Sequence, residues 1–341
     1  MKAVRFHEHG DLDVLRYEDV DDPDPGPDDV VVQVHGCALN HLDLFQRRGI
    51  PGITLPHVSG SDISGVVAKS MVPDVTEGQR VMLQPGLSCG RCRACLLGAD
   101  NLCARYDIIG YRNEGGYADL VKAPAVNVIS LPDHIGFHEA AAFPLVFVTA
   151  WHMLVAGARL LSGETVLVWA AGSGVGQAAI QIARLHGARV IATAGNDDKL
   201  ARARKLGAHE VINHYTQDVA AEVRALVGRG GVDVVCEHVG DATWAASLKC
   251  LGRGGRLVTC GATTGPQVSL DLRHLFTKQQ SLIGSYMGTK GELLRAAHHF
   301  FEGELIPVVD KVLPLSQAAD AQRRLEDKAQ FGKIVLDPLA S

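Results

Sequence analysis

The chain has 341 residues, and its 33 Lys and Arg against 38 Asp and Glu give a formal net charge of −5. Hydrophobic residues make up 47% of the sequence and charged residues 21%, an ordinary globular composition that excludes a disordered or fibrous chain. A mildly acidic chain without a run of Lys or Arg is a poor partner for nucleic acid, and its length is sufficient for two domains.

The first 125 residues have the pattern of a β-rich domain. Short valine-rich runs at 30–34, 64–68 and 80–83 are separated by Pro and Gly. The acidic, proline-rich stretch 21–29 can form neither a helix nor a central strand, so we expect an exposed turn there.

From about residue 140 the periodicity changes to alternating strands and helices. The expected strands are 165–169, 189–193, 232–236 and 256–259, and the helices between them are 176–186, 198–206, 219–226 and 243–251. This alternation is typical of βαβ units on a parallel sheet, and so of an α/β fold. The tail is expected to add helices at 293–301 and 318–329 and a strand at 333–336.

Neither a secretory signal nor a membrane span is expected. The charged start of the chain does not resemble a signal peptide, and Pro144, Thr149 and His152 interrupt the apolar run 140–158. Four cysteines are scattered through apolar runs, as is typical of buried thiols in a reducing cytosol: Cys37, Cys236, Cys250 and Cys260. We therefore expect a cytoplasmic protein with no membrane partner.

A turn of small residues at 170–176 joins the expected strand 165–169 to a helix. Such a turn lets the backbone approach a pyrophosphate, whose charge the helix N-terminus then stabilises. Ala171 and Ser173 replace the first two glycines of the G-x-G-x-x-G pattern. We interpret the turn as a dinucleotide site with contacts from Ser173, Gly174 and Val175; a turn that serves only packing is the alternative.

The next strand ends at Asn196 without the carboxylate that would bind a ribose 2′-hydroxyl, and Lys199 lies one helical turn further on. A missing acid removes repulsion of a 2′-phosphate, and a lysine can neutralise that phosphate. The pattern therefore favours NADP(H) over NAD(H), with Asn196 and Lys199 in the site. The alternative is that Lys199 is a solvated helix residue.

Four cysteines occupy fifteen residues, with the spacing C-x2-C-x2-C-x7-C: Cys89, Cys92, Cys95 and Cys103. Four thiolates are typical of a structural zinc site, which has no open position for chemistry. An iron–sulfur cluster is the main alternative, but bacterial ferredoxins place the fourth cysteine after three residues and before a proline. We expect one structural zinc per chain, in a lobe at 86–104.

This arrangement resembles the medium-chain dehydrogenase/reductase superfamily, which includes zinc-containing alcohol dehydrogenases and quinone oxidoreductases. The resemblance covers essentially the whole chain and extends through 38–43, 56–62, 114–118, 149–151 and 332–336. It implies a GroES-like catalytic domain at 1–148 and 286–341, and a Rossmann domain with a doubly wound parallel sheet at 149–285.

The sequence departs from the superfamily where its alcohol dehydrogenases bind a catalytic zinc. Asn40 stands at the first Cys ligand, Ser61 stands at the His ligand, and 144–149 lacks the distant Cys. A replacement ligand set is the alternative: Cys37, His41, His57 and Asp62.

The pattern is similar to the zinc-independent quinone and enoyl reductases of the superfamily. This resemblance implies an NADPH-dependent oxidoreductase that transfers hydride to an activated C=C, quinone or enone without a catalytic metal. Hydrogen-bond donors would then stabilise the oxyanion. Asn40 is the first candidate for orienting nicotinamide or substrate, and His41 is a candidate donor or proton relay. A turn residue and a structural histidine are the respective alternatives.

The resemblance implies further cofactor contacts. Thr149 would approach the nicotinamide ribose, and the backbones of Val239 and Gly261 would line the nicotinamide at two strand ends. Lys333 would reach the diphosphate, and Tyr215 would face the adenosine phosphate.

Two other functions stay open: a zinc-dependent alcohol dehydrogenase with atypical ligands, and an NADP-binding sensor or structural protein. The expected partner is a small-molecule substrate, for which Arg47 and Arg48 could bind an anionic group, although solvated charges are the simpler interpretation. The apolar pair 282–283 could join a homodimer or homotetramer.

Overall fold

The computed structural model describes residues 1–340, which form two compact units. Unit 1 comprises 1–145, 289–293 and the C-terminal part from 307; unit 2 comprises 146–288 and 294–306. The division differs from the expected boundaries mainly at 294–306, which we had placed in the catalytic domain. This segment belongs to unit 2 because Gln181 Nε2 donates to the Ile306 carbonyl at 2.9 Å and its Oε1 accepts from the Ile306 amide at 2.8 Å.

Unit 1 is built around a seven-stranded sheet. Six of its strands follow the order β10-β6-β5-β3-β18-β17, and the seventh, β9, also pairs with β3. A three-stranded sheet, β2-β1-β4, and a two-stranded ribbon, β7-β8, complete it. The strands of unit 1 are β1 (Lys2–Phe6), β2 (Arg16–Asp19), β3 (Asp29–Ala38), β4 (His57–Val58), β5 (Asp62–Ser70), β6 (Arg80–Leu83), β7 (Gly86–Leu87), β8 (Asp107–Ile108), β9 (Leu120–Pro124), β10 (Val128–Ser130), β17 (Val309–Pro314) and β18 (Lys333–Asp337).

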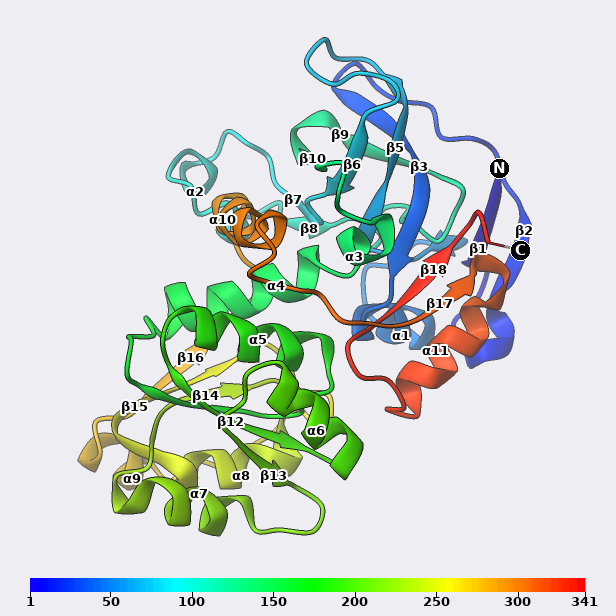
Figure 1. Cartoon of the computed structure of the whole chain (residues 1–341). Coiled ribbons are helices and arrows are strands. Elements are labelled where there is room, and N and C mark those ends of the chain that lie inside the picture. The colour runs from blue at the N-terminus through cyan, green and yellow to red at the C-terminus, as the bar shows by residue number, and fades with distance from the viewer. Residues whose placement is uncertain (341) are drawn as a thin grey trace. The chain divides into compact units, whose positions relative to one another are not determined.

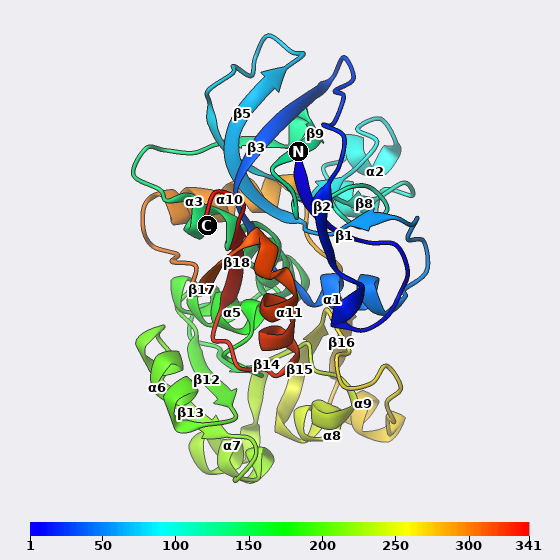
Figure 2. The ribbon, with the colours of Figure 1, turned by 90° about the vertical axis from the view of Figure 1, so that its right-hand side faces the viewer.

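The predicted valine-rich strands and the exposed turn at 21–29 are confirmed. The valines of β3 are buried, and the C-terminal strand β18 pairs with β3 antiparallel, so the last residues of the chain complete the first sheet. Figure 2 shows helix α11 (Ala318–Glu326) beside β17 and β18.

The helices of unit 1 are short: α1 (His41–Arg48), α2 (Arg93–Leu96), α3 (Phe137–Ala141) and α11. Helix α1 lies inside the region that the sequence predicts to be β-rich, and the helix was not expected there. It ends at Gly49, whose φ of 104° is left-handed and favours glycine. The expectation that Arg47 is solvated is wrong: its side chain is fully buried and donates to Gln322, Glu326 and the Gly10 carbonyl.

Unit 2 contains a six-stranded parallel sheet in the order β13-β12-β11-β14-β15-β16. Chain order therefore reverses between β11 and β14, the switch point of a doubly wound sheet. Helix α5 lies on one face of the sheet and α7 and α8 lie on the other (Figure 1). The strands are β11 (Thr165–Val168), β12 (Arg189–Ala194), β13 (Glu210–Asn213), β14 (Val232–Glu237), β15 (Leu251–Thr259) and β16 (Ser281–Gly284).

The helices of this sheet match the predicted 3.6-residue periodicity within a few residues. They are α5 (Gly174–Leu185), α6 (Asp197–Lys205), α7 (Val219–Val227) and α8 (Asp241–Cys250), whereas α9 (Leu272–Thr277) and strand β13 were not expected from the sequence. The apolar run 140–158 forms the end of α3, then α4 (Pro144–Trp151) and a π-helix (His152–Gly157), and α10 (Lys290–Phe301) comes near the end of the chain. No helix within residues 1–340 is both long and apolar enough to cross a membrane.

Candidate functional site

The small-residue turn of unit 2 has the geometry of a phosphate cradle. Strand β11 ends at Val168, Ala170 adopts a left-handed φ of 48°, and α5 begins at Gly174. A Cβ on Gly176 would lie 2.3 Å from the Ala170 carbonyl oxygen, so only glycine allows the helix to start this close to the strand. Ser173 caps α5, because its Oγ accepts from the Gly176 amide at 2.8 Å. The predicted contacts Ser173, Gly174 and Val175 thus lie at a helix N-terminus, where an anion is stabilised.

His238, which the sequence analysis did not single out, reaches this turn. It follows β14 directly, and its Nε2 lies 2.8 Å from Ser173 Oγ. Burial lowers the pKa of His238, although the neighbouring Glu237 opposes the shift. The available signal was its position immediately before Val239, at the end of a parallel strand.

The candidates for the adenosine side gather where β12 and β13 end side by side, with Ala194 opposite Asn213. Asn196 caps α6 by accepting from the Lys199 amide at 2.9 Å, and Lys199 is half-buried in the first helical turn. The Tyr215 ring is 71% exposed yet packs on the strand end, since a Cβ on Gly195 would lie 2.4 Å from it. The structure therefore brings Asn196, Lys199 and Tyr215 to one edge of the sheet.

Val239 and Gly261, whose backbones are expected to line the nicotinamide, follow the ends of β14 and β15. The Val239 carbonyl accepts from both the amide and the hydroxyl of Thr264, each at 2.8 Å, so its two lone pairs are engaged within unit 2. The expected backbone contact of Val239 with nicotinamide stays a prediction. Gly261 approaches the neighbouring strand end, because a Cβ on it would lie 3.2 Å from the His238 carbonyl oxygen.

Two hydroxyls in unit 2 are buried with no hydrogen-bond partner among residues 1–340. They are Thr149 Oγ1, a predicted ribose contact in α4, and Ser285 Oγ, which follows β16 and which the sequence analysis missed. Buried polar groups are rarely unpaired, so both hydroxyls are suited to a ligand.

A buried cluster in unit 1 holds Asn40 and Lys333. The Lys333 ammonium lies 2.6 Å from Asn40 Oδ1 and 2.8 Å from Asp62 Oδ2, and the Asn40 amide donates to the same carboxylate oxygen at 2.9 Å. The other oxygen, Asp62 Oδ1, accepts from the Leu145 amide at 2.7 Å. Only 3% of the Lys333 side chain and none of Asp62 is exposed. The predicted diphosphate ligand Lys333 is therefore engaged in an ion pair within its own unit.

Beside this cluster lies a buried carboxyl group. Asp43 Oδ2 accepts from the backbone amide of Asn40 at 2.8 Å and from the Tyr117 hydroxyl at 3.0 Å. Burial raises the pKa of Asp43 to about 6, and these two hydrogen bonds oppose the shift. Asp43 Oδ1 and Ser61 Oγ are both buried and lack partners among residues 1–340.

The alternative metal-ligand set is engaged elsewhere. His57 Nε2 lies 3.1 Å from the Gly110 carbonyl oxygen, Cys37 is fully buried, and Asp62 binds Lys333. Burial lowers the pKa of His57 and raises the pKa of the Cys37 thiol. The fourth member, His41, is the half-buried first residue of α1, with its ring 6.5 Å from that of Phe45.

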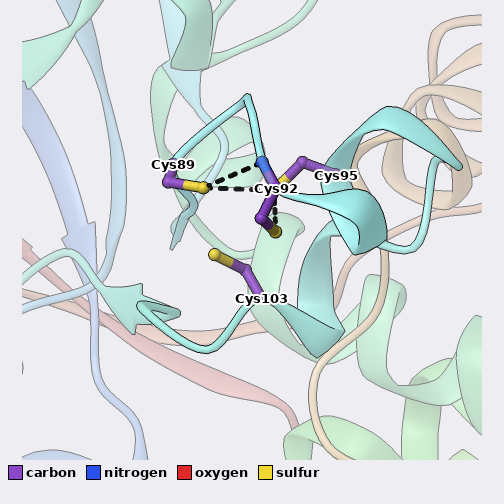
Figure 3. A group of neighbouring side chains, drawn as sticks. All are labelled: Cys89, Cys92, Cys95 and Cys103. Atoms are coloured by element: carbon purple, nitrogen blue, oxygen red, sulfur yellow. Dashed lines mark hydrogen bonds between the residues drawn. The ribbon is translucent and has the colours of Figure 1, made fainter.

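The four clustered cysteines point their sulfur atoms toward one another (Figure 3). All four lie within 4.8 Å of one another, with Cys92 to Cys95 at 3.5 Å and Cys89 to Cys95 at 4.0 Å. A tetrahedral zinc with bonds of about 2.3 Å places its sulfurs roughly 3.8 Å apart, so the cluster fits this ion. The backbone amide of Arg91 and the side chain of Arg105 lower the pKa of Cys89 to about 5, which favours the thiolate that a metal needs.

Comparisons with known proteins agree with this architecture. Residues 26–133 match the alcohol dehydrogenase GroES-like domain family, and residues 174–302 match the zinc-binding dehydrogenase family. A quinone oxidoreductase of Sus scrofa is 31% identical, over 98% of this chain and 97% of its own.

Solved structures give the same result. An NAD-dependent alcohol dehydrogenase is 46% identical with a TM-score of 0.96, over 99% of both chains. A 2-octenoyl-CoA carboxylase reductase, in complex with NADP and 2-octenoyl-CoA, is 28% identical with a TM-score of 0.90, over 98% of this chain and 87% of that one. The expected GroES-like and Rossmann-type domains are thus confirmed. The chain belongs to the medium-chain dehydrogenase/reductase superfamily and is an NAD(P)-dependent oxidoreductase.

Proposed function

We propose that the protein is an NADPH-dependent reductase that transfers hydride to an activated C=C, a quinone or an enone without a catalytic metal. The observation that supports this most is the bonding of Lys333. By the resemblance, Asn40 stands at a zinc-ligand position, yet its oxygen accepts from the Lys333 ammonium. Asp62, the neighbouring carboxylate, binds the same ammonium. These two oxygens are therefore bound to a positive charge that belongs to the protein.

The proposed reaction is a conjugate reduction. A bound nicotinamide would supply hydride to the acceptor, the carbonyl or quinone oxygen would take up the negative charge, and a proton from solvent would complete the product. The amide of Asn40 is fixed by Lys333 and Asp62, so we assign Asn40 to holding that ammonium as well as to orienting a ligand. His41, half-buried at the start of α1, is the proposed donor or proton relay.

The preference for NADPH is also a proposal. Lys199 lies in the first turn of α6, where its backbone amide donates to the Asn196 side chain, and α6 follows the end of β12. The aromatic ring of Tyr215 packs on the same strand end. A 2′-phosphate would find a cation and a hydrogen-bond donor at this edge.

We assign the ion at Cys89, Cys92, Cys95 and Cys103 to structural zinc. The sulfur spacing matches a four-coordinate site, and four thiolates leave no position for substrate. Zinc would stabilise the lobe between β7 and β8, a segment with few regular elements.

The second candidate function is an alcohol dehydrogenase with atypical ligands, and the 46% identity with an NAD-dependent alcohol dehydrogenase favours it. An NADP-binding protein without turnover is a third. The three functions differ in metal content and in nucleotide oxidation.

The test combines metal analysis of purified protein with an acceptor panel. We expect one zinc per chain, and NADPH oxidation with a quinone, an enone or an enoyl thioester that mild chelation leaves unchanged. Two zinc ions per chain, with alcohol oxidation that chelation abolishes, would instead establish the alcohol dehydrogenase. Binding of NADPH without oxidation across the whole panel would identify the third function.

Self-association through β16 is a separate proposal. This strand is the edge of the six-stranded sheet, and its residues Leu282 and Ile283 are half-buried. An edge strand offers unpaired backbone groups to a second copy. Light scattering coupled to size exclusion should give a dimer or tetramer, whereas a monomer at micromolar concentration would refute the proposal.

A further inference from the structure

The Ser173–His238 hydrogen bond spans the switch point of the sheet in unit 2. Ser173 follows β11 and His238 follows β14, and these adjacent strands are the pair between which chain order reverses. In open α/β sheets, ligands bind in the crevice outside the carboxyl ends of the strands at this point. The hydrogen bond therefore lies where a dinucleotide must cross the sheet.

The hydrogen bond uses one of the two nitrogens of the His238 ring and leaves the other without a partner. Nε2 lies 2.8 Å from Ser173 Oγ, whereas Nδ1 is buried and has no partner among residues 1–340. Only 9% of the residue is exposed, so water has little access to Nδ1. An unpaired buried nitrogen is costly, and its persistence calls for an explanation.

Stabilisation of the strand end does not provide that explanation, because Glu237 already fulfils this role. Glu237 Oε1 accepts from the amides of Val239 and Gly240, and its Oε2 accepts from the hydroxyls of Thr243 and Ser247. The start of α5 is fixed in the same way, since Ser173 Oγ accepts from the Gly176 amide. Neither element needs His238 Nδ1.

We propose that His238 is a cofactor-positioning residue: its Nε2 orients the Ser173 hydroxyl at the phosphate turn, and its Nδ1 contacts an oxygen of the bound dinucleotide. A buried neutral imidazole has one N–H and one lone pair, so Nδ1 is a donor if Ser173 donates to Nε2 and an acceptor if Nε2 donates to Ser173. Phosphate oxygens suit a donor, and ribose hydroxyls suit either role. This inference needs only a nicotinamide cofactor, and it stands whether or not the reaction uses a metal.

Two substitutions separate the two nitrogens. In His238→Gln the terminal amide can take the place of Nε2 and keep the contact with Ser173, while the Nδ1 contact is lost. In His238→Asn the shorter amide can take the place of Nδ1, while the contact with Ser173 is lost. His274→Asn, at an exposed histidine in α9 of the same unit, is the matched control.

The readout is the dissociation constant of NADPH and of NADH, measured by titration calorimetry without any acceptor. We expect His238→Gln to weaken binding about tenfold, His238→Asn to weaken it less than about threefold, and the control to have no effect. The proposal would be overturned if both His238 variants bound the nucleotides as the wild type does. It would also be overturned if His238→Asn bound them more weakly than His238→Gln. Thermal unfolding of each variant without nucleotide reports whether its fold is intact.

Fragments of the dinucleotide identify the contacted oxygen. If Nδ1 binds phosphate, His238→Gln weakens binding of both ADP and ADP-ribose. If Nδ1 binds the second ribose, His238→Gln weakens binding of ADP-ribose alone. Either result supports the proposal, whereas unchanged binding of both fragments and of the dinucleotide refutes it. Because no acceptor is present, failure of this inference is distinct from failure of the proposed reductase activity.

Discussion

The buried ion pair between Lys333 and Asp62 allows a quantitative test of unit 1. Lys333→Met keeps the length of the side chain but removes both hydrogen bonds of the ammonium, to Asn40 Oδ1 and to Asp62 Oδ2. The Asp62 carboxylate then remains fully buried, with only the Asn40 amide and the Leu145 backbone amide as donors.

Removal of one partner of a buried ion pair typically costs about 3–5 kcal/mol, because the remaining charge has lost its compensation. We expect the free energy of unfolding of unit 1 to fall by that amount in Lys333→Met. The double variant Asp62→Asn/Lys333→Met carries no buried charge at the pair, so it should be more stable than Lys333→Met alone by roughly 2 kcal/mol. Lys311→Met, at an exposed lysine on the neighbouring strand β17, should change stability by less than about 0.5 kcal/mol.

The assay must report on unit 1. All three tryptophans, Trp151, Trp169 and Trp244, lie in unit 2, so intrinsic tryptophan fluorescence would follow the other unit. Hydrogen exchange of peptides that cover β3 and β18 measures the opening free energy of the affected sheet directly. If Lys333→Met protected these strands as well as the control does, the ammonium would not be paired as described, and the main support for the metal-free reductase would be lost.

Three further predictions concern other residues. Because the pKa of Asp43 is raised to about 6 in the fold, protonation favours the folded state, so between pH 7 and pH 4 the wild type should gain about 2.4 kcal/mol relative to Asp43→Asn in urea unfolding; a pH-independent difference would contradict this assignment. Lys199→Glu should weaken NADPH binding at least tenfold and leave NADH nearly unchanged, as measured by nucleotide fluorescence titration, whereas equal losses would mean that Lys199 acts only structurally. Cys103→Ser should lower bound zinc from one per chain toward zero in metal analysis, and retention of the zinc would remove Cys103 from the ligand set.

Most of unit 2 was predictable because its information is local, although β13 and α9 were not expected. Apolar residues recur at the spacing of a strand or a helix within a short segment, and the turn before α5 is recognisable from consecutive small residues. For this reason the interpretation placed Ser173 in the turn before a helix, Asn196 at a strand end and Lys199 one helical turn beyond it. The same local signals also located the four cysteines within fifteen residues.

The clusters of unit 1 could not be found in this way, since their members are far apart in the sequence. Asp62 and Lys333 are 271 residues apart, and β18 must pair with β3 before the ammonium can meet Asn40. Arg47 looked like a solvated charge because its partner Glu326, on α11, lies 279 residues away. Helix α1 was missed because its eight residues follow a long run of strand pattern.

The polar cluster of Asn40, Asp62 and Lys333 differs from the Ser173–His238 pair in how many of its polar atoms have hydrogen-bond partners. This difference distinguishes a fixed charge from a binding site. In unit 1, both polar atoms of the Asn40 side chain and both oxygens of Asp62 already have partners within the unit, so the Lys333 charge is held without any ligand. In unit 2, His238 Nδ1 remains buried and unpaired among the described residues, at the carboxyl end of a parallel strand. A cluster that is complete needs nothing from a ligand, whereas an incomplete one gains hydrogen bonds when a ligand arrives. The dinucleotide should therefore stabilise unit 2 beyond the contribution of its phosphate turn alone, and Lys333 should keep its partners when the dinucleotide binds.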